Sequence, residues 1–186
     1  MAAASSSSRT KRNREEEVDI LQKYTIDRNE KLGAGGFSNV FLANNNATGE
    51  EVACKIVKIG APPLPSRQQV EYEANILKTL NYASIIKVWD HCPGKSPDDG
   101  NKYFIFMELA SGGELFAHLG EDNCLEENEA RRIFMPLVDG VAYCQLAGVA
   151  HRDLKLENVM LTKEGAVKIV DFGLAHVYPK NADGSI

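Results

Sequence analysis

The chain has 186 residues, of which 44% are apolar and 25% charged, and its formal net charge is −5. This composition is ordinary for a globular protein, and no apolar run approaches the ~18 residues of a membrane-spanning helix. The acidic balance gives no reason to expect nucleic-acid binding, which favours a basic face. We therefore expect a globular protein with no membrane span and no nucleic-acid partner.

The four cysteines stand far apart, without a C-x-x-C pair and without an apolar signal segment before them. This pattern is typical of reduced thiols in an intracellular protein, cytoplasmic or nuclear, and it lacks the spacing of a zinc site. Residues 1–22 are rich in small and charged residues and predict a disordered tail. An organelle transit peptide is the alternative for this start, although acidic residues follow at 15–17.

From Tyr24 onward, the sequence predicts strands separated by turns. Glycines at 33, 35 and 36 lie between two extended segments, and residues 44–49 are a strong turn signal. Residues 52–59 are rich in β-branched side chains and predict the next strand, which the prolines of residues 61–65 end. Further strands are expected at residues 85–89 and 103–107.

Residues 67–80 predict an amphipathic helix. Its apolar side chains recur at helical spacing, at Val70, Ala74, Leu77 and Leu80. Glu73 falls within this stripe, where a buried carboxylate is unfavourable unless a partner neutralises it. Lys55 lies in an otherwise apolar strand and could be that partner, the alternative being an edge lysine that reaches water.

The second half of the chain predicts mostly helix, with a short helix at residues 114–119 and a longer one at 126–146. We expect one side of the longer helix to carry Ile133, Phe134, Leu137, Val141 and Cys144. Pro136 falls inside this helix, where it removes a hydrogen bond or produces a kink. Beyond residue 159, short apolar runs predict a hairpin around residues 163–165. The order of elements predicts an α+β protein with a β-rich lobe and a helical lobe.

A glycine-rich turn occupies residues 33–36, between two predicted strands. Glycines let such a turn fold closely over an anion, so that backbone N–H groups meet phosphate oxygens. A dinucleotide-binding turn would lead into a helix, and a P-loop would end in G-K-[ST]; neither feature is present. On its own this turn is a weak signal of nucleotide binding.

Two polar motifs follow, H-R-D-L-K-L-E-N at residues 151–158 and D-F-G at residues 171–173. Asp153 can accept a hydroxyl proton, and Lys155 can balance phosphate charge. Asn158 and Asp171 can supply hard oxygen ligands for magnesium. Either motif alone could be a polar loop, but both together, in order after Lys55, point to phosphate chemistry.

This ordered set of motifs resembles the eukaryotic protein kinases of the serine/threonine type. The resemblance runs from about Tyr24 to the end and implies a two-lobe fold with an incomplete helical C-lobe. The implied lobes are an N-lobe at about residues 23–107, a hinge at 108–113 and a partial C-lobe at 114–186. The implied reaction is transfer of the γ-phosphate of ATP to Ser or Thr hydroxyls of protein substrates, with Mg²⁺ as cofactor.

The resemblance also implies a role for individual residues. Asp153 resembles the catalytic base, with Lys155 beside it, while Lys55 should hold the α- and β-phosphates and Glu73 should orient Lys55. Met107 resembles the residue that gates the back of the adenine pocket. The implied nucleotide-binding residues are Leu32, Gly33, Ala34, Gly35, Gly36, Phe37, Ser38, Val40, Ala53, Lys55, Glu108, Ala110 and Met160, and the implied metal ligands are Asn158 and Asp171.

Finer features look most similar to the calcium/calmodulin-dependent kinase group. By this resemblance, Glu114 and Glu157 meet a basic residue upstream of the target hydroxyl, which predicts a preference for Arg or Lys there. Ser38 replaces the third glycine of G-x-G-x-x-G, and the family's Ala-Pro-Glu motif does not occur before Ile186. We therefore also expect apolar surface to be exposed on the helix at residues 126–146. The alternative function is a truncated kinase-like fragment, or an incomplete gene model, with a binding or regulatory role. The oligomeric state is left open.

Overall fold

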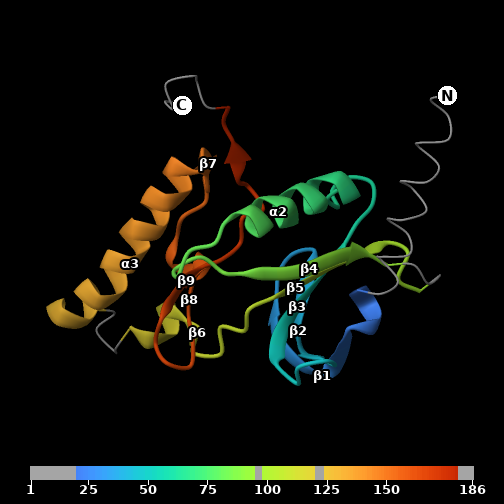
Figure 1. Ribbon diagram of the computed structural model, residues 1–186, viewed down its shortest axis with the longest axis horizontal. Coiled ribbons are helices and arrows are strands. Elements are labelled where there is room, and N and C mark those ends of the chain that lie inside the picture. The colour runs from blue at the N-terminus through green and yellow to red at the C-terminus, as the bar shows by residue number, and fades with distance from the viewer. Residues whose placement is uncertain (1–19, 95–97, 120–123, 180–186) are drawn as a thin grey trace. The chain divides into compact units, whose positions relative to one another are not determined.

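The computed structural model describes residues 20–94, 98–119 and 124–179, which fall into two compact units (Figure 1). One unit takes the chain up to Glu71 and again Trp89–Met107, and the other takes Tyr72–Val88 and the chain from Glu108 onward. Helix α2 (Arg67–Thr79) begins in the first unit and ends in the second. Within the described ranges, no helix combines the length and apolarity needed to cross a bilayer.

The first unit contains a five-stranded sheet, as the strand-rich start of the sequence predicts. Its strands are, in spatial order, β1 (Tyr24–Ala34), β2 (Ser38–Asn45), β3 (Glu51–Lys58), β5 (Lys102–Met107) and β4 (Val88–Pro93). The β1–β2, β2–β3 and β3–β5 pairs are antiparallel. Residues 46–48 form the turn that the sequence predicts between β2 and β3.

One predicted strand was wrong in its bounds, since β4 runs Val88–Pro93 and not over residues 85–89. Ile85 and Ile86 are used elsewhere, because Ile85 bridges Ile169 and the Ile86 N–H donates to the Ile169 carbonyl at 3.0 Å. A partner more than eighty positions away therefore decides what this apolar run does.

The core of the first unit lies on one face of the sheet. Tyr24 stacks on Phe106 with ring centroids 3.9 Å apart, and Ile20 and Leu21 pack against the same cluster. The other buried members of the cluster are Ala43, Val52, Cys54, Ile56, Cys92 and Phe104. Ordered packing therefore begins before residue 23, while residues 1–19 of the predicted tail lie outside the described residues.

Helix α2 confirms the predicted amphipathic pattern. Its apolar stripe is buried, with Val70, Ala74, Leu77 and Leu80 each exposed by 3% or less. Glu73 lies within that stripe and is only 9% exposed. The helical period alone therefore places this carboxylate on the buried side.

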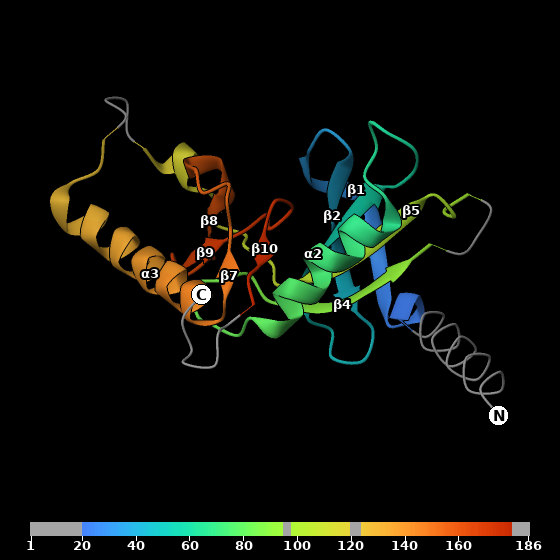
Figure 2. The ribbon, with the colours of Figure 1, turned by 90° about the horizontal axis from the view of Figure 1, so that it is seen from above.

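The second unit combines one long helix with short strands. The helix is α3 (Glu127–Leu146), and β7 (Val149–Ala150) pairs with β10 (His176–Val177). A three-stranded sheet is formed by β6 (Gly113–Glu114), β8 (Val159–Leu161) and β9 (Val167–Ile169). The antiparallel β8–β9 pair confirms the predicted hairpin, and both views show α3 beside β7 and β9 (Figures 1 and 2). The short helix expected at residues 114–119 is a 3₁₀ turn, η1 (Leu115–His118), and a second 3₁₀ turn, η2 (Leu156–Asn158), precedes β8.

The packed face of α3 differs from the prediction at two positions. Ile133 and Leu137 pack against a small core made of Leu115, Val159, Leu161 and Val167, and Cys144 is buried. Phe134 and Val141, which were expected on the same side, are 63% and 39% exposed. They are rotated away from the line of residues 133, 137, 140 and 144 that faces inward, so the apolar sequence pattern overestimates the packed face.

Pro136 inside α3 has a structural partner. The Ser84 hydroxyl donates to the Pro136 carbonyl at 2.6 Å. One helical turn further along, Gly140 leaves the space that this hydroxyl occupies, because a Cβ at Gly140 would lie 2.5 Å from Ser84 Oγ. At the proline, therefore, a side chain from outside the helix donates a hydrogen bond to a carbonyl of the helix backbone.

The four cysteines are thiols, of which Cys124 is exposed and the other three are buried. Burial raises the pKa of Cys144 to about 11 from its usual 9.0, because thiolate is poorly solvated there. We expect iodoacetamide at neutral pH to label one site per native chain, which mass spectrometry should locate at Cys124 and which Cys124→Ser should remove. Labelling of Cys144 in the folded protein would contradict this.

The raised pKa of Cys144 also predicts how stability depends on pH. Between about pH 9 and 11, the Cys144 thiol loses its proton in the unfolded state but keeps it in the folded state. The free energy of unfolding should therefore fall across that window.

Candidate functional site

The glycine-rich turn joins β1 to β2 in the first unit. It is closed by a hydrogen bond from the Gly35 N–H to the Ser38 carbonyl at 2.8 Å. A Cβ added at Gly33 or Gly36 would meet no atom within 4 Å. The space beside these two residues is therefore open to a ligand that approaches the backbone closely. Leu32 and Phe37, which flank the turn, are exposed.

Three predicted nucleotide-binding residues share one face of the sheet. Directly paired residues in neighbouring strands point to the same side, and Val40 pairs with Lys55 while Ala53 pairs with Met107. The pairs Phe41–Cys54 and Cys54–Phe106 alternate with them and point to the opposite face, which holds the apolar core. Val40, Ala53 and Lys55 therefore lie together, on the side away from that core.

In the second unit, three predicted residues meet in the loop between β7 and β8. The Asn158 side chain is buried, and its Nδ2 donates to the Asp153 carbonyl at 2.8 Å and to Asp153 Oδ2 at 3.0 Å. Lys155 Nζ lies 3.1 Å from the same Oδ2 atom. This contact raises the pKa of Lys155, because the hydrogen bond to the Asp153 carboxylate favours the ammonium form. Both hydrogen bonds of the Asn158 side chain use its Nδ2 atom, so the Oδ1 atom is left to act as an acceptor.

Asp171 is fastened to this loop through its neighbours. The Val170 N–H donates to the Asn158 carbonyl, and His151 Nε2 donates to the Val170 carbonyl, each at 3.0 Å. His151 Nδ1 then accepts the Asp153 N–H at 3.3 Å. Asp171 has a φ of 59° and Arg152 one of 67°, a left-handed conformation that is uncommon outside glycine. Arg152 follows His151, and Asp171 follows its partner Val170. Two left-handed residues beside one such hydrogen bond are typical of a functional site that its surroundings hold under strain.

Glu73 lies beside the same segment. A Cβ built on Gly173 would be 3.3 Å from Asp171 Oδ1 and 3.5 Å from Glu73 Oε2. The structure therefore brings Glu73 next to the D-F-G motif within the second unit. Lys55 belongs to the first unit, and its pairing with Glu73 stays a prediction.

The start of the predicted hinge is held by a lysine that the sequence reading missed. Lys168 Nζ lies 2.7 Å from Glu108 Oε1, and the Lys168 side chain is nearly buried. The Glu108 N–H donates to the Lys87 carbonyl at 2.8 Å, and Glu108 Oε2 accepts the Lys87 N–H at 3.3 Å. Lys168 stands between Val167 and Ile169, so the signal that singled out Lys55, a cation in an apolar strand, was also available here.

The arrangement fits a magnesium ion that is shared with a substrate. The described ranges contain no cluster of three or more His, Cys, Asp or Glu side chains that could hold a metal on its own. Asn158 and Asp171 offer one amide oxygen and one carboxylate, and Mg²⁺ commonly takes one or two protein oxygens together with water and substrate phosphates.

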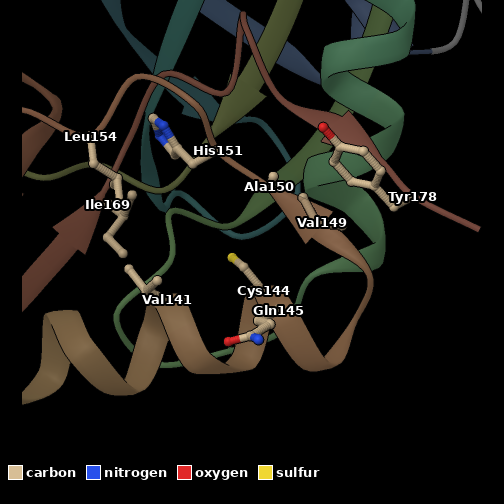
Figure 3. A pocket seen from close by; sticks show the side chains of 9 residues that line it. All are labelled: Val141, Cys144, Gln145, Val149, Ala150, His151, Leu154, Ile169 and Tyr178. Atoms are coloured by element: carbon tan, nitrogen blue, oxygen red, sulfur yellow. The ribbon is translucent and has the colours of Figure 1, made fainter. Parts of the chain in front are cut away.

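A separate apolar cavity of about 430 Å³ lies beside α3 (Figure 3). Its walls come from α3, β7, β9, the loop after β7 and Tyr178. His151 and Leu154 are the loop residues that line it, and none of the predicted nucleotide or metal residues does so. The cavity is therefore distinct from the cluster around Asp153.

The chain matches the sequence profile of the protein kinase domain over residues 26–184. It is 38% identical over 156 residues to CBL-interacting serine/threonine-protein kinase 1 of Arabidopsis thaliana, covering 83% of this chain and 34% of that protein. It is 39% identical over 157 residues to CBL-interacting protein kinase 17 of Oryza sativa subsp. japonica, covering 84% and 33%. It is also 38% identical over 161 residues to SNF1-related protein kinase catalytic subunit alpha KIN12 of Arabidopsis thaliana, covering 86% and 31%. The chain spans about a third of the length of these relatives.

Proposed function

Because the chain belongs to the protein kinase domain family, we propose that it transfers the γ-phosphate of ATP to Ser or Thr hydroxyls of protein substrates. The observation that carries this proposal is the cluster of Asp153, Lys155 and Asn158, joined by contacts of 3.1 Å or less. The names of the matched relatives, which include serine/threonine-protein kinases, support the choice of hydroxyl.

Asp153 is the residue that we assign to the substrate hydroxyl. Its Oδ2 atom is engaged by Asn158 Nδ2 and Lys155 Nζ, so the proton of the attacking hydroxyl would pass to Oδ1. Lys155 Nζ would balance the charge of the transferring phosphoryl group. The bond from Asn158 to the Asp153 carbonyl holds the aspartate backbone and so fixes the direction of its side chain.

Asn158 Oδ1 and the Asp171 carboxylate would hold Mg²⁺. When bound, this ion neutralises charge on the β- and γ-phosphates of ATP. The hydrogen bond from the Val170 N–H to the Asn158 carbonyl supports this role, because it holds together the start of β8 and the end of β9, which the two ligand residues flank.

The remaining predicted residues would bind the nucleotide. The open glycine turn would cover the phosphates, and Lys55 would hold the α- and β-phosphates with Glu73 as its partner. The Glu108 N–H is already donated to Lys87, so the Glu108 carbonyl is the hinge group that we assign to adenine, together with the Ala110 N–H. Ala53 and Met160 complete the proposed adenine site.

Transfer of labelled phosphate from γ-³²P-ATP and Mg²⁺ to Ser- and Thr-containing peptides tests this function in the 186-residue chain. We expect incorporation into Ser or Thr that depends on both Mg²⁺ and ATP. Binding of Mg-ADP without any phosphate transfer would contradict the proposal.

We also propose that the chain belongs to the calcium/calmodulin-dependent branch and prefers Arg or Lys before the phosphorylated residue. Glu114 and Glu157 are exposed, and the elements that carry them, β6 and η2, pack against each other. Glu114→Gln and Glu157→Gln should each weaken the preference for upstream Arg or Lys about five- to tenfold, since each removes roughly 1 kcal/mol of attraction. A peptide library scored by kcat/KM measures this preference.

The control for these substitutions is Glu126→Gln, which removes an exposed carboxylate just before α3. It should leave the profile unchanged. A wild-type profile without any basic preference would refute the assignment of Glu114 and Glu157.

A second candidate function is a binding or regulatory role with little catalysis. The observation in its favour is the apolar face of α3, where Phe134, Met135 and Val138 are 63%, 52% and 44% exposed. The phosphate-transfer assay separates the candidates, because a binding role alone predicts nucleotide or partner binding with no labelled product.

A further inference from the structure

The strand after the D-F-G motif has one edge that β7 does not cover. β10 pairs with β7 on one side, and the Tyr178 N–H donates to the Gly148 carbonyl on that side at 2.8 Å. Successive N–H groups of a strand point to opposite edges, so the Val177 N–H points away from β7. The Tyr72 hydroxyl of α2 accepts this N–H at 3.1 Å, across 105 positions of sequence.

The neighbouring residue of α2, Glu73, lies beside the other end of residues 171–177. Glu73 Oε2 lies 3.5 Å from the Cβ position of Gly173, and Asp171 Oδ1 lies 3.3 Å from it. Arg152 Nε also donates to the Leu174 carbonyl at 2.7 Å, which fixes the middle of the segment to the loop that carries Asp153. Of two adjacent residues of one helix, Tyr72 therefore bonds to one end of residues 171–177 and Glu73 lies beside the other end.

We propose that Tyr72 is a positioning residue, whose hydroxyl fastens β10 to α2 and thereby holds Asp171 in place for the magnesium–nucleotide complex. The positioning role rests on the proposed kinase function, while the hydrogen bond does not. Tyr72 is 45% exposed, so its hydroxyl does not serve to pair a polar group buried in the core. The hydrogen bond instead fixes the position of β10 relative to α2, because the Val177 N–H on this strand edge would otherwise bond to water.

Tyr72→Phe removes this one oxygen and keeps the ring, which makes a folded variant the expected outcome. Tyr82→Phe is a matched control in the same unit, since Tyr82 is a similarly exposed tyrosine whose ring stacks on Tyr143. The first measurement is amide hydrogen exchange at Val177 without nucleotide. We expect Tyr72→Phe to speed this exchange about five- to tenfold and Tyr82→Phe to leave it unchanged.

The second measurement is the affinity for ADP with and without Mg²⁺, by calorimetry. We expect Tyr72→Phe to reduce the gain in affinity that Mg²⁺ provides by about threefold or more, with little change for ADP alone. The comparison separates two effects. A misplaced Asp171 would lower only the affinity measured with Mg²⁺, whereas a general loosening of the fold would weaken both affinities equally.

Unchanged exchange at Val177 in Tyr72→Phe would overturn the proposal that the Tyr72 hydroxyl fastens β10 to α2, whatever the activity of the chain. Faster exchange with an unchanged Mg²⁺ gain would overturn the positioning role. If the wild-type chain shows no Mg²⁺-dependent ADP binding, the proposed function fails and the positioning role fails with it. The Val177 exchange rates still decide whether the Tyr72 hydroxyl fastens β10 to α2.

Discussion

Replacing Asp153 with asparagine is expected to lower the rate of phosphate transfer by about 10²–10⁴-fold, because an amide cannot accept the proton of the substrate hydroxyl. Nucleotide affinity should change little, since the bond from Asn158 to the backbone carbonyl of residue 153 is retained in the variant. Single-turnover transfer to a Ser peptide measures the first quantity, and titration with Mg-ADP measures the second.

Asp139→Asn is the matched control for this experiment, because Asp139 is an exposed carboxylate on α3. It should transfer phosphate at the wild-type rate. Wild-type activity in Asp153→Asn would refute the proposed base. A parallel loss of nucleotide affinity and thermal stability would instead show that Asp153 supports the loop between β7 and β8 and is not primarily a base.

Gly140→Ala is expected to destabilise the protein, although alanine normally favours a helix over glycine by ~1 kcal/mol. The new Cβ would lie 2.5 Å from Ser84 Oγ and 3.1 Å from Ile169 Cδ1, where there is no room for it. Overpacking of this kind costs roughly 1–3 kcal/mol. We expect a net loss in the free energy of unfolding of about 1–2 kcal/mol, measured by urea denaturation.

The double variant Gly140→Ala with Ser84→Ala provides the control. Ser84→Ala removes the close Oγ atom and leaves the Ser84 Cβ at 3.6 Å, an ordinary contact distance. The double variant should therefore lose less stability than the sum of the two single variants. Strict additivity, or a stabilising Gly140→Ala, would mean that the hydroxyl of Ser84 does not determine the need for glycine at this position.

The strands and helices of this chain were largely predictable because their signals are local. The β-branched run of β3 and the helical spacing of α2 each report a backbone period that neighbouring residues set. The same period placed Glu73 on the buried side of α2. The motif at residues 151–158 also predicted that Asp153, Lys155 and Asn158 act together, because residues so close in one loop can reach one another.

A local pattern gives the period of an element but not the partner that it meets. The sequence by itself determined the order of the motifs, the amphipathic α2 and the position of the glycine-rich turn. Only the tertiary structure decided that Phe134 faces outward, and only it gave the contacts of Tyr72 with Val177 and of Lys168 with Glu108. Each of these outcomes depends on residues distant in the sequence, and their spatial proximity follows from packing of the folded chain.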